Sequence, residues 1–432
     1  MARKIITAID VGTSKITTLI TSVEDGKNPM VIGVCAHPSK GIKKGVVVNI
    51  DDATSAILES VTAAERMAGV TVSDAFVSIN GEQVTSLNNK GVVAVAGSEI
   101  TIDDTYRAIE NARILTLPDN LNPIHIIPRE FVVDSQGGIK YPIGMSGGKL
   151  EVDTHIITAP NSYWQNIKKC VEQVGANVYD VIFTAWASSL AVLTDTEKEL
   201  GVTLLDIGAG TTGITIFQEG SIVYSACVPL GGTSITSDIA IGLQVSLEEA
   251  EKIKINMNDL FDAKYEGVKA KDLDSIPTIL RKKEVATPKK RKEADLDLNV
   301  IGIDKVVSKD MLVKIVNARC EEIFEMVKDN ISKAGYDIAM PAGIVLTGGS
   351  SLLRDITKFT QGLLGTAARI GYPSGLTGMT EEISDPAYAC VQGLIKHALD
   401  DDVEIGTTGE KSKVDVKGFF GKIGDWFKSL LP

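Results

Sequence analysis

The sequence predicts an α/β protein that is built from two similar domains. Its 432 residues far exceed the ~150 residues of a typical domain. A motif made of an apolar run, an Asp, an apolar residue and a Gly occurs twice, around Asp10 and around Asp206. Stretches with helical periodicity alternate with β-branched runs that are typical of strands. These observations favour a duplicated α/β fold.

The two copies of the motif predict two β-hairpins. Residues 5–16 read IITAIDVGTSKI, and residues 202–214 read VTLLDIGAGTTGI. In each copy a strand-like run ends at the Asp, a Gly-containing turn follows, and a second strand-like run begins. We therefore expect one hairpin in each half of the chain, with the Asp next to its turn.

The second copy also fits the G-x-G-x-x-G fingerprint of dinucleotide-binding proteins, through Gly208, Gly210 and Gly213. That fingerprint has to open a helix whose N-terminus receives the pyrophosphate. Here the run ITIF follows, which alternates like a strand. GMSGGKL, near Lys149, lacks the spacing of a phosphate-binding P-loop. Both of these interpretations are therefore rejected.

The segment between the hairpins is expected to contain an inserted module. Its sequence pattern changes from long periodic runs to short strand-like runs that are separated by Pro and Gly. The expected elements are, in chain order, a helix at 51–68, a strand at 76–79, an α+β insertion at 84–163 with a helix near 103–115, and helices at 162–174 and 184–194.

A second insertion is expected after the second hairpin. Helices extend to about residue 260, a polar stretch covers 264–299, and a helix near 309–334 follows. Seven residues from Arg281 to Lys292 are basic. Such a run is either a solvated surface loop or a docking site for an acidic partner.

A third motif, GIVLTGGSSLL at residues 343–353, predicts a strand, a paired-glycine turn and a helix that begins at Leu352. Either Ser350 or Ser351 is a suitable cap for that helix. With the two Asp hairpins, this motif indicates a nucleotide site. Hairpin amides would cradle the phosphates, both carboxylates would face Mg²⁺ through water, and the Gly-Gly turn would lie against the adenosine.

These motifs resemble those of the actin-like ATPase superfamily, whose fold is a duplicated RNase H-like unit. Residues 9–16, 204–214 and 343–353 are similar to its phosphate-1, phosphate-2 and adenosine motifs. Residues 184–194 and 386–399 look like its two connecting helices. The resemblance covers nearly the whole chain and implies that ATP and Mg²⁺ are the cofactors.

The resemblance also implies roles for individual residues. Asp10 would hold Mg²⁺ through water, and Asp206 would orient the attacking water as the second catalytic carboxylate. The residues expected to bind the nucleotide are Gly12, Thr13, Ser14 and Lys15 of the first hairpin, Gly208, Gly210, Thr211 and Thr212 of the second, Glu251 and Lys254 at the ribose or adenine, and Gly348, Gly349 and Ser350 of the third motif.

The chain departs from the superfamily at Thr184. Actins carry Gln at this place in the first connecting helix, and MreB and the heat-shock chaperone ATPases carry Glu. A Thr hydroxyl cannot act as a carboxylate base. We therefore expect firm ATP binding with slow hydrolysis, and turnover comparable with a metabolic kinase would contradict this.

The end of the chain predicts a membrane-binding helix behind a polar linker at 400–416. On a helical projection of 417–432, the apolar side chains gather on one face, while Lys417, Lys422 and Lys428 outweigh Asp425. Such a helix lies in a membrane interface and is too short to span it. A terminal helix docked on the core is the alternative. The expected membrane-binding residues are Phe419, Phe420, Ile423, Trp426, Phe427, Leu430 and Leu431.

Composition and charge restrict the function further. The formal net charge of −12 argues against a general nucleic-acid-binding protein, and any contact with an anionic membrane has to be local. Five widely spaced cysteines are typical of a reduced cytosolic protein. No stretch reaches the ~20 apolar residues of a transmembrane helix.

The actin-like motifs, the insertion at 84–163 and the terminal amphipathic helix together resemble the FtsA family of bacterial division proteins. That resemblance implies a protein that polymerises into filaments with itself at the cytoplasmic side of the membrane, at the division site, and tethers FtsZ filaments there. The C-terminal tail of FtsZ would bind subdomain IIB, and later divisome proteins would bind subdomain IC.

The resemblance also implies subdomain boundaries. The expected segments are 1–83 and 164–197 for subdomain IA, 84–163 for IC, 198–230 and 302–379 for IIA, 231–301 for IIB, and 380–399 for the return helix of IA.

Three other interpretations stay open. A pilus-assembly scaffold that resembles PilM also carries an inserted module, but it would not need the terminal helix. A sugar kinase of the same fold would need a substrate base in its cleft. A chaperone ATPase is disfavoured, because too few residues follow the last connecting helix to form a substrate domain.

Overall fold

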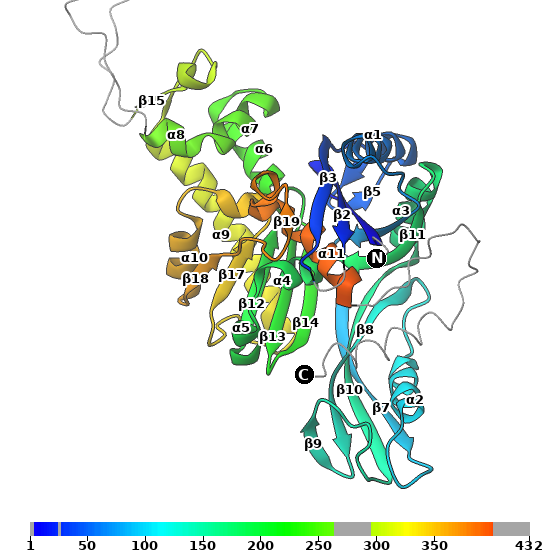
Figure 1. Cartoon of the computed structure of the whole chain (residues 1–432). Helices are drawn as coiled ribbons and strands as arrows, with labels where there is room; N and C mark the ends of the chain where they lie inside the picture. Colours follow the sequence, from blue (N-terminus) through cyan, green and yellow to red (C-terminus); the bar gives the residue numbers. More distant parts are fainter. Residues whose placement is uncertain (1–3, 25–26, 263–294, 401–432) are drawn as a thin grey trace, which may run out of the picture. The chain divides into compact units, whose positions relative to one another are not determined.

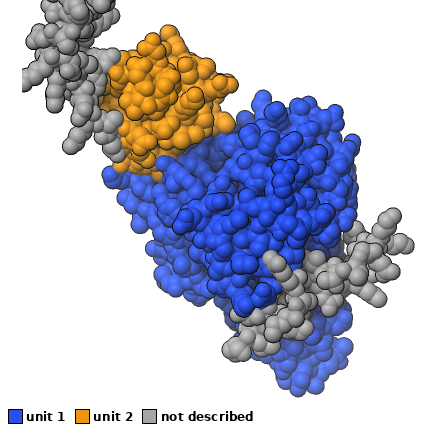
Figure 2. Space-filling view, turned by 45° about the horizontal axis from the view of Figure 1, so that its top comes forward, with its two compact units in different colours: residues 1–232, 323–352, 357–432 blue, residues 233–322, 353–356 orange. Residues whose placement is uncertain are grey.

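The computed structural model describes residues 4–24, 27–262 and 295–400 (Figure 1). The chain divides into two compact units (Figure 2). The first unit comprises residues 1–232, 323–352 and 357–432, and the second comprises 233–322 and 353–356.

The first unit contains a six-stranded sheet in the order β11-β6-β1-β2-β3-β19. Strands β1 and β2 form the predicted first hairpin, with Asp10 opposite Thr17. Strands β6 and β11 then add in parallel beside β1. The strands are β1 (Lys4–Val11), β2 (Lys15–Val23), β3 (Met30–Pro38), β6 (Asp74–Ile79), β11 (Asn177–Phe183) and β19 (Thr377–Gly378).

A second sheet in the first unit has five strands in the order β14-β13-β12-β17-β18. Strands β12 and β13 form the predicted second hairpin, and β17 and β18 add in parallel beside β12. This order repeats that of β3-β2-β1-β6-β11, so the predicted duplication is confirmed. The strands are β12 (Val202–Ile207), β13 (Thr212–Gln218), β14 (Ser221–Val228), β17 (Ile344–Thr347) and β18 (Ala368–Ile370).

Helices α4 (Thr184–Val192) and α11 (Ala389–Asp400) pack tightly against each other, as expected for the connecting helices. A Cβ atom at Gly393 would lie 1.7 Å from the Ala187 carbonyl oxygen, so only glycine allows this approach. Helix α1 (Ile50–Ala68) packs on β2 and β3 and against helix α3 (Asn161–Gln173). Helix α5 (Asp195–Leu200) and the short strands β4 (Ile42–Lys43) and β5 (Val46–Val47) complete this region.

The insertion folds as a four-stranded sheet, β7-β10-β8-β9, with helix α2 on one face (Figure 1). Its core includes Ile100, Ile109, Phe131 and Leu150, all at most 1% exposed. The α+β character predicted for this segment is confirmed. The elements are β7 (Thr85–Ala94), α2 (Ile102–Arg113), β8 (Leu121–Val133), β9 (Gln136–Ile139) and β10 (Lys149–Pro160).

The second unit is mainly helical, as predicted for the segment up to about residue 260. Within this unit, Gly242 of α6 lies close to Ile315 of α9. An ion pair from Arg319 Nε to Asp238 Oδ2, 2.5 Å long, joins the same two helices. The elements are α6 (Gly232–Leu243), α7 (Leu247–Ile255), α8 (Met257–Asp262), β15 (Asp295–Asp297), β16 (Val306–Ser308) and α9 (Lys309–Lys333).

One predicted helix start is wrong. After β17 the chain makes a 3₁₀ turn at Gly349–Leu352, and helix α10 begins only at Ile356 (Ile356–Leu364). The backbone turns left-handed at Gly348 and again at Asp355, with φ of 80° and 56°. An α-helix cannot run through the second of these positions, so neither Ser350 nor Ser351 caps a helix at Leu352.

Three predicted features lie outside the described residues: the linker from residue 401 onward, the amphipathic helix at 417–432 and the basic run at 281–292. Within the described part of the chain, no helix has the length and apolar character needed to cross a membrane.

Candidate functional site

The two hairpins place Asp206 in buried surroundings and leave Asp10 half-buried. Asp10 lies next to the end of β1, and Asp206, 7% exposed, next to the end of β12. Burial raises the pKa of Asp10, although hydrogen bonds and the charge of Lys15 partly offset this. Burial raises the pKa of Asp206 to about 7, against the effect of a serine hydrogen bond, and the negative charge of Asp10 adds to the rise. The two predicted carboxylates therefore share one electrostatic environment.

Each carboxylate is held by a serine that sequence reasoning missed. Ser78 of β6 donates to Asp10 Oδ1 at 2.8 Å and accepts from the Val11 amide at 2.8 Å. Ser188 of α4 donates to Asp206 Oδ2 at 2.6 Å. Ser188 lies one helical turn after Thr184, which was a usable signal. Ser78 becomes a neighbour only through the pairing of β6 with β1, so no local pattern reveals it.

The turns of the two hairpins meet. In each, the first glycine closes the turn, because the Gly12 amide donates to the Lys15 carbonyl and the Gly208 amide donates to the Thr211 carbonyl, at 3.1 Å and 2.9 Å. A Cβ atom at Gly210 would lie 2.6 Å from Thr13 Oγ1. The predicted phosphate-binding residues of both hairpins are thus brought together, and glycine at 210 is needed for that contact.

A loop and a strand end support the second hairpin. Asn80 donates through Nδ2 to Thr211 Oγ1 at 3.0 Å, and Thr212 Oγ1 donates to the Leu230 carbonyl at 2.9 Å. The Gly208 carbonyl accepts from the Gly232 amide at 3.0 Å. Sequence reasoning singled out the two threonines but not Asn80 or the 230–232 loop, which come from distant parts of the chain.

The third motif also joins the second hairpin. A Cβ atom at Gly348 would lie 2.4 Å from Asp206 Oδ1, so this position has to be glycine. Ser350 Oγ donates to the Gly208 carbonyl at 3.0 Å. The predicted partner Gly349 is less constrained, since a Cβ atom there would meet only Ala387 Cβ, at 3.5 Å.

Lys15 lies against an aromatic ring that the sequence did not suggest. Its Nζ is 3.7 Å from the centre of the Tyr388 ring. Burial lowers the pKa of Lys15, while the charges of Asp10 and Asp385 oppose this. One half-buried cation therefore stands near Asp10. The neighbouring Ser14 accepts through its carbonyl from the Ser39 amide at 3.0 Å.

Glu251 and Lys254, predicted at the ribose or adenine, lie on α7 of the second unit. Their side chains form an ion pair of 2.8 Å. Both also contact the Thr236 hydroxyl of α6, which donates to Glu251 Oε2 and accepts from Lys254 Nζ. The structure brings these two residues together within the second unit.

Thr184 begins helix α4, and its hydroxyl donates to the Ile79 carbonyl at 2.9 Å. Its proton is therefore engaged, and its oxygen is a far weaker base than a carboxylate. Asp10 and Asp206 are the two carboxylates next to the hairpin turns.

The side chains and amides at the two hairpin turns are suited to bind a divalent cation together with the phosphates of a nucleotide. Asp10 and Asp206 have raised pKa values, and a nearby positive charge would stabilise their ionised forms. Mg²⁺ prefers oxygen ligands and keeps several of its waters. Amides in the two turns and Lys15 are the groups that bind phosphate oxygens elsewhere. The donor set thus suits a cation held through water by Asp10, beside Asp206.

The sequence is similar to known proteins over most of its length. Residues 203–393 match the family model described as "Cell division protein FtsA", and residues 81–158 match "SHS2 domain inserted in FTSA". A Pseudomonas aeruginosa protein named "Cell division protein FtsA" is 36% identical, with 92% of this chain and 89% of that protein covered. A protein of the same name from Borreliella burgdorferi is 34% identical, with 99% and 100% covered.

Solved structures show the fold. A "PilM-PilN type IV pilus biogenesis complex" aligns with a TM-score of 0.59 at 13% identity, covering 91% of this chain and 98% of that chain. MreB5 of Spiroplasma citri, described as bound to ADP, aligns with a TM-score of 0.50 at 14% identity, covering 93% and 99%. The predicted actin-like fold is confirmed.

Proposed function

Because the chain belongs to the FtsA family of cell division proteins, we propose that it binds ATP, polymerises at the cell membrane and tethers FtsZ filaments there. The observation that carries the nucleotide part is the meeting of the two hairpins, where Thr13 and Gly210 touch beside the paired carboxylates Asp10 and Asp206. A protein of the same fold, MreB5 of Spiroplasma citri, is described as bound to ADP.

In this proposal the phosphates lie along the two turns, with Gly12, Thr13, Ser14 and Lys15 on one side. Gly208, Gly210, Thr211 and Thr212 take the other side. Asp10 would hold Mg²⁺ through water, and the cation, when bound, would neutralise phosphate charge. Asp206, held by Ser188, orients the attacking water.

Hydrolysis is proposed to be slow. Thr184 stands where actins and MreB carry a Gln or Glu, and its hydroxyl is already engaged by the Ile79 carbonyl. A site without that side chain binds and orients the nucleotide but loses one contributor to water activation. Slow hydrolysis suits a filament subunit, because the bound ATP then stays intact for as long as the filament exists.

Attachment to the membrane is assigned to residues 417–432, on the sequence pattern alone. Their apolar face, from Phe419 to Leu431, and their lysines suit an anionic interface. A single short helix binds weakly, and linking many in one filament raises the effective affinity. In this view the protein works at the cytoplasmic side of the membrane, at the division site.

The remaining partners follow the subdomain boundaries proposed from the sequence. The insertion at 84–163 would contact neighbouring subunits and later divisome proteins, and the segment 231–301 would receive the FtsZ tail. Whether the basic run at 281–292 takes part is testable by charge reversal. FtsZ binding that survives the reversal would remove that run from the proposal.

The decisive experiment is co-sedimentation with anionic vesicles and ATP, which compares the full chain with a chain lacking residues 417–432. The full chain should pellet with the vesicles and carry FtsZ with it, and the truncated chain should stay in the supernatant. Binding of a fluorescent ATP analogue by both chains controls for folding. Unchanged pelleting after truncation would contradict the membrane assignment.

The pilus-scaffold and sugar-kinase alternatives gain no support. The likeness to the PilM complex shows the fold alone, at 13% identity, whereas the division proteins reach 36%. A kinase would need a substrate carboxylate base in its cleft, and phosphate release stimulated by a small metabolite would reveal it.

A further inference from the structure

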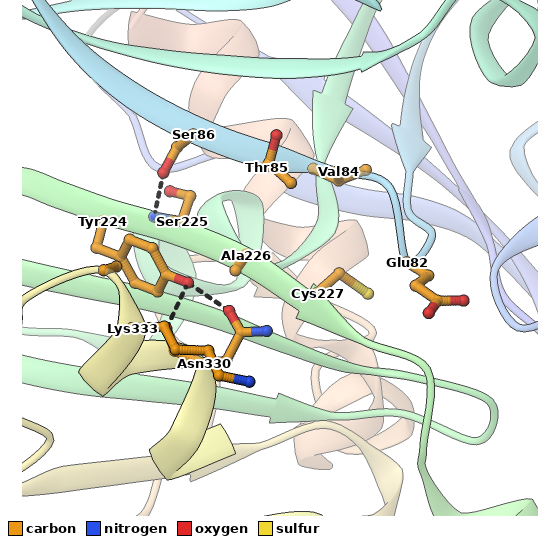
Figure 3. A pocket seen from close by; sticks show the side chains of 11 residues that line it. Glu82, Val84, Thr85, Ser86, Tyr224, Ser225, Ala226, Cys227, Asn330 and Lys333 are labelled. Carbon is orange, nitrogen blue, oxygen red and sulfur yellow. Dashed lines mark hydrogen bonds between the residues drawn. The ribbon is translucent and has the colours of Figure 1, made fainter. Parts of the chain in front are cut away.

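A cavity of about 300 Å³ lies in the first unit, beside the second hairpin (Figure 3). Strand β7 and the loop before it form one wall, strand β14 forms another, and the end of helix α9 closes a third side. The volume is at the lower end of the range for small-molecule sites. Nothing in the proposed nucleotide chemistry uses this cavity.

The cavity exists because two edge strands meet without pairing. Strand β14 is at the edge of one sheet and β7 at the edge of another, and side chains rather than a backbone ladder join them. The Ser225 amide donates to Ser86 Oγ at 2.8 Å, and Asn88 Nδ2 donates to the Val223 carbonyl at 3.0 Å. Side chains hold the strands apart, so space remains beside them.

A buried histidine fixes this junction. His155 is fully buried, and its ring nitrogens lie 2.8 Å from Asn88 Oδ1 and 3.0 Å from Ser225 Oγ. Burial lowers the pKa of His155 to about 3, with a further contribution from Arg129. The ring therefore stays neutral near neutral pH, and the walls of the cavity keep their arrangement.

The two ends of the cavity carry opposite charges. Glu82 lies at one end beside Cys227, and Lys333 lies at the other with Asn330 and Tyr224 (Figure 3). In the described part of the chain, neither Glu82 nor Lys333 has an ion-pair partner. The Tyr224 hydroxyl donates to Asn330 Oδ1, which leaves the amide nitrogen of Asn330 as a donor next to Lys333.

Between the charged ends the lining is apolar or neutral. Val84 and Ala226 line this stretch, and burial raises the pKa of Cys227 to about 12, so its thiol stays protonated. A purely apolar ligand would leave the charges of Glu82 and Lys333 without an opposite charge on the ligand. A simple anion would bind Lys333 but be repelled by Glu82. A ligand that carries both charges is complementary to both ends.

We propose that this cavity binds a small zwitterion whose ammonium and carboxylate groups are separated by a short apolar chain, as in an ω-amino acid, with the ammonium group at Glu82 and the carboxylate at Lys333 and the Asn330 amide. Its middle part would lie along Val84 and Ala226. Both charged side chains are exposed, so the affinity is expected to be modest, near the millimolar range that corresponds to about 4 kcal/mol.

The cavity adjoins the second hairpin, which gives such a ligand a route to the nucleotide. Cys227 pairs with Gly213, directly after Thr212, in the β13–β14 ladder. Asn80, two residues before Glu82, donates to Thr211 Oγ1. Occupancy is therefore expected to change ATP affinity. This consequence rests on the proposed function, whereas binding of the zwitterion does not.

Binding is tested on the full chain without nucleotide. Amino acids whose ammonium and carboxylate groups are separated by an increasing number of methylene groups, from glycine to aminohexanoate, are screened up to about 10 mM by saturation-transfer NMR, and calorimetry then measures each hit. Each hit is compared with its N-acetyl and carboxamide derivatives, which lack one charge. We expect at least one amino acid to bind, and both derivatives to bind about tenfold more weakly or worse, because hydrogen bonds to charged groups are lost.

Matched variants locate the site. Glu82→Gln and Lys333→Gln should each weaken binding about tenfold or more. Glu59→Gln on α1 and Lys328→Gln on α9 change exposed charges that do not line the cavity, and both should bind like the parent. All four changes are at exposed positions, and an unchanged melting temperature confirms folding.

The proposal is overturned if no amino acid binds the parent chain by 10 mM, or if Glu82→Gln and Lys333→Gln bind a hit as tightly as the parent does. Derivatives that bind as well as the zwitterion would overturn it too. ATP affinity is measured separately on the same proteins. If the nucleotide assignment is wrong, ATP does not bind, whereas binding of the zwitterion is unaffected.

Discussion

At the scale of residues, Asp10 and Asp206 show how burial prepares a charged ligand site. Each carboxylate accepts a hydrogen bond from a serine on another element, Ser78 or Ser188. These bonds do not offset the loss of hydration, so both pKa values rise. A cation brought close to them should reverse that rise, because a positive charge favours the ionised carboxylate.

We expect Asp206→Asn to be more stable than the parent chain at pH 8, in the absence of nucleotide and Mg²⁺. The pKa of Asp206 is about 7 in the folded chain and ~3.9 in an unfolded one, so the folded state binds the proton more tightly. This contribution to stability is complete below pH ~4 and is lost as the pH rises through about 7. Asn does not titrate and can still accept from Ser188.

The difference in unfolding free energy, variant minus parent, should therefore increase by about 2–4 kcal/mol between pH 4 and pH 8. Urea unfolding at the two pH values measures it. Asp119→Asn, at an exposed position, is the control and should show no such increase. An equal difference at both pH values for Asp206→Asn would contradict the prediction.

Adjacent glycines of the third motif give a second prediction. Gly348→Ala should weaken ATP binding at least tenfold, because its φ is 80° and its new methyl group would lie 2.4 Å from Asp206 Oδ1. Gly349→Ala should bind nearly as the parent does, since its methyl group meets only Ala387 at 3.5 Å. Titration with a fluorescent ATP analogue distinguishes the two, and equal affinities would count against the site.

At the scale of elements, the strength of the local signal decided which predictions succeeded. Both hairpins were predicted because β-branched runs and Gly-containing turns lie within a few residues of each other. The prediction of a helix that begins at Leu352 was wrong, because the backbone is left-handed at Gly348 and Asp355. The Ser351 hydroxyl donates to the Gly348 carbonyl at 2.8 Å instead of capping a helix. Strand β14 was not predicted, although it completes the second sheet.

The contact between the connecting helices gives a prediction at this scale. Gly393→Ala should destabilise the chain by about 3 kcal/mol or more, because the new methyl group would lie 1.7 Å from the Ala187 carbonyl oxygen and the helices would have to separate. Gly362→Ala is the matched control. It lies in helix α10 with nothing within 4 Å of the added methyl group.

The control should gain about 0.5–1 kcal/mol from helix propensity alone. Thermal unfolding of both variants measures the two effects, which are expected to have opposite signs. A Gly393→Ala chain that melts with the parent would show that α4 and α11 do not pack as closely as described.

At the scale of the whole molecule, the duplicated sheets and the insertion agree with the family that the chain belongs to. Residues 417–432 lie outside the described part, so their role has to be tested directly. Two variants that add the same negative charge do this. Trp426→Glu places it on the predicted apolar face, and Ser429→Glu places it on the polar face.

We expect Trp426→Glu to lower vesicle binding about tenfold or more, because it replaces buried aromatic area with a charge in the interface. Ser429→Glu should lose much less, since only electrostatic attraction to the anionic lipid changes. Pelleting with vesicles of graded anionic content measures both. Equal losses would mean that charge rather than the apolar face governs attachment.

The sequence by itself determined the duplicated α/β fold, the two hairpins and the identity of Asp10 and Asp206, because these depend on short patterns of residue types. Only the tertiary structure decided which side chains hold those carboxylates. Ser78 and Ser188 reach them through strand pairing and helix packing between segments that are far apart in the chain. The charged cavity of Glu82 and Lys333 likewise arises from three distant segments, and no local pattern records such a meeting.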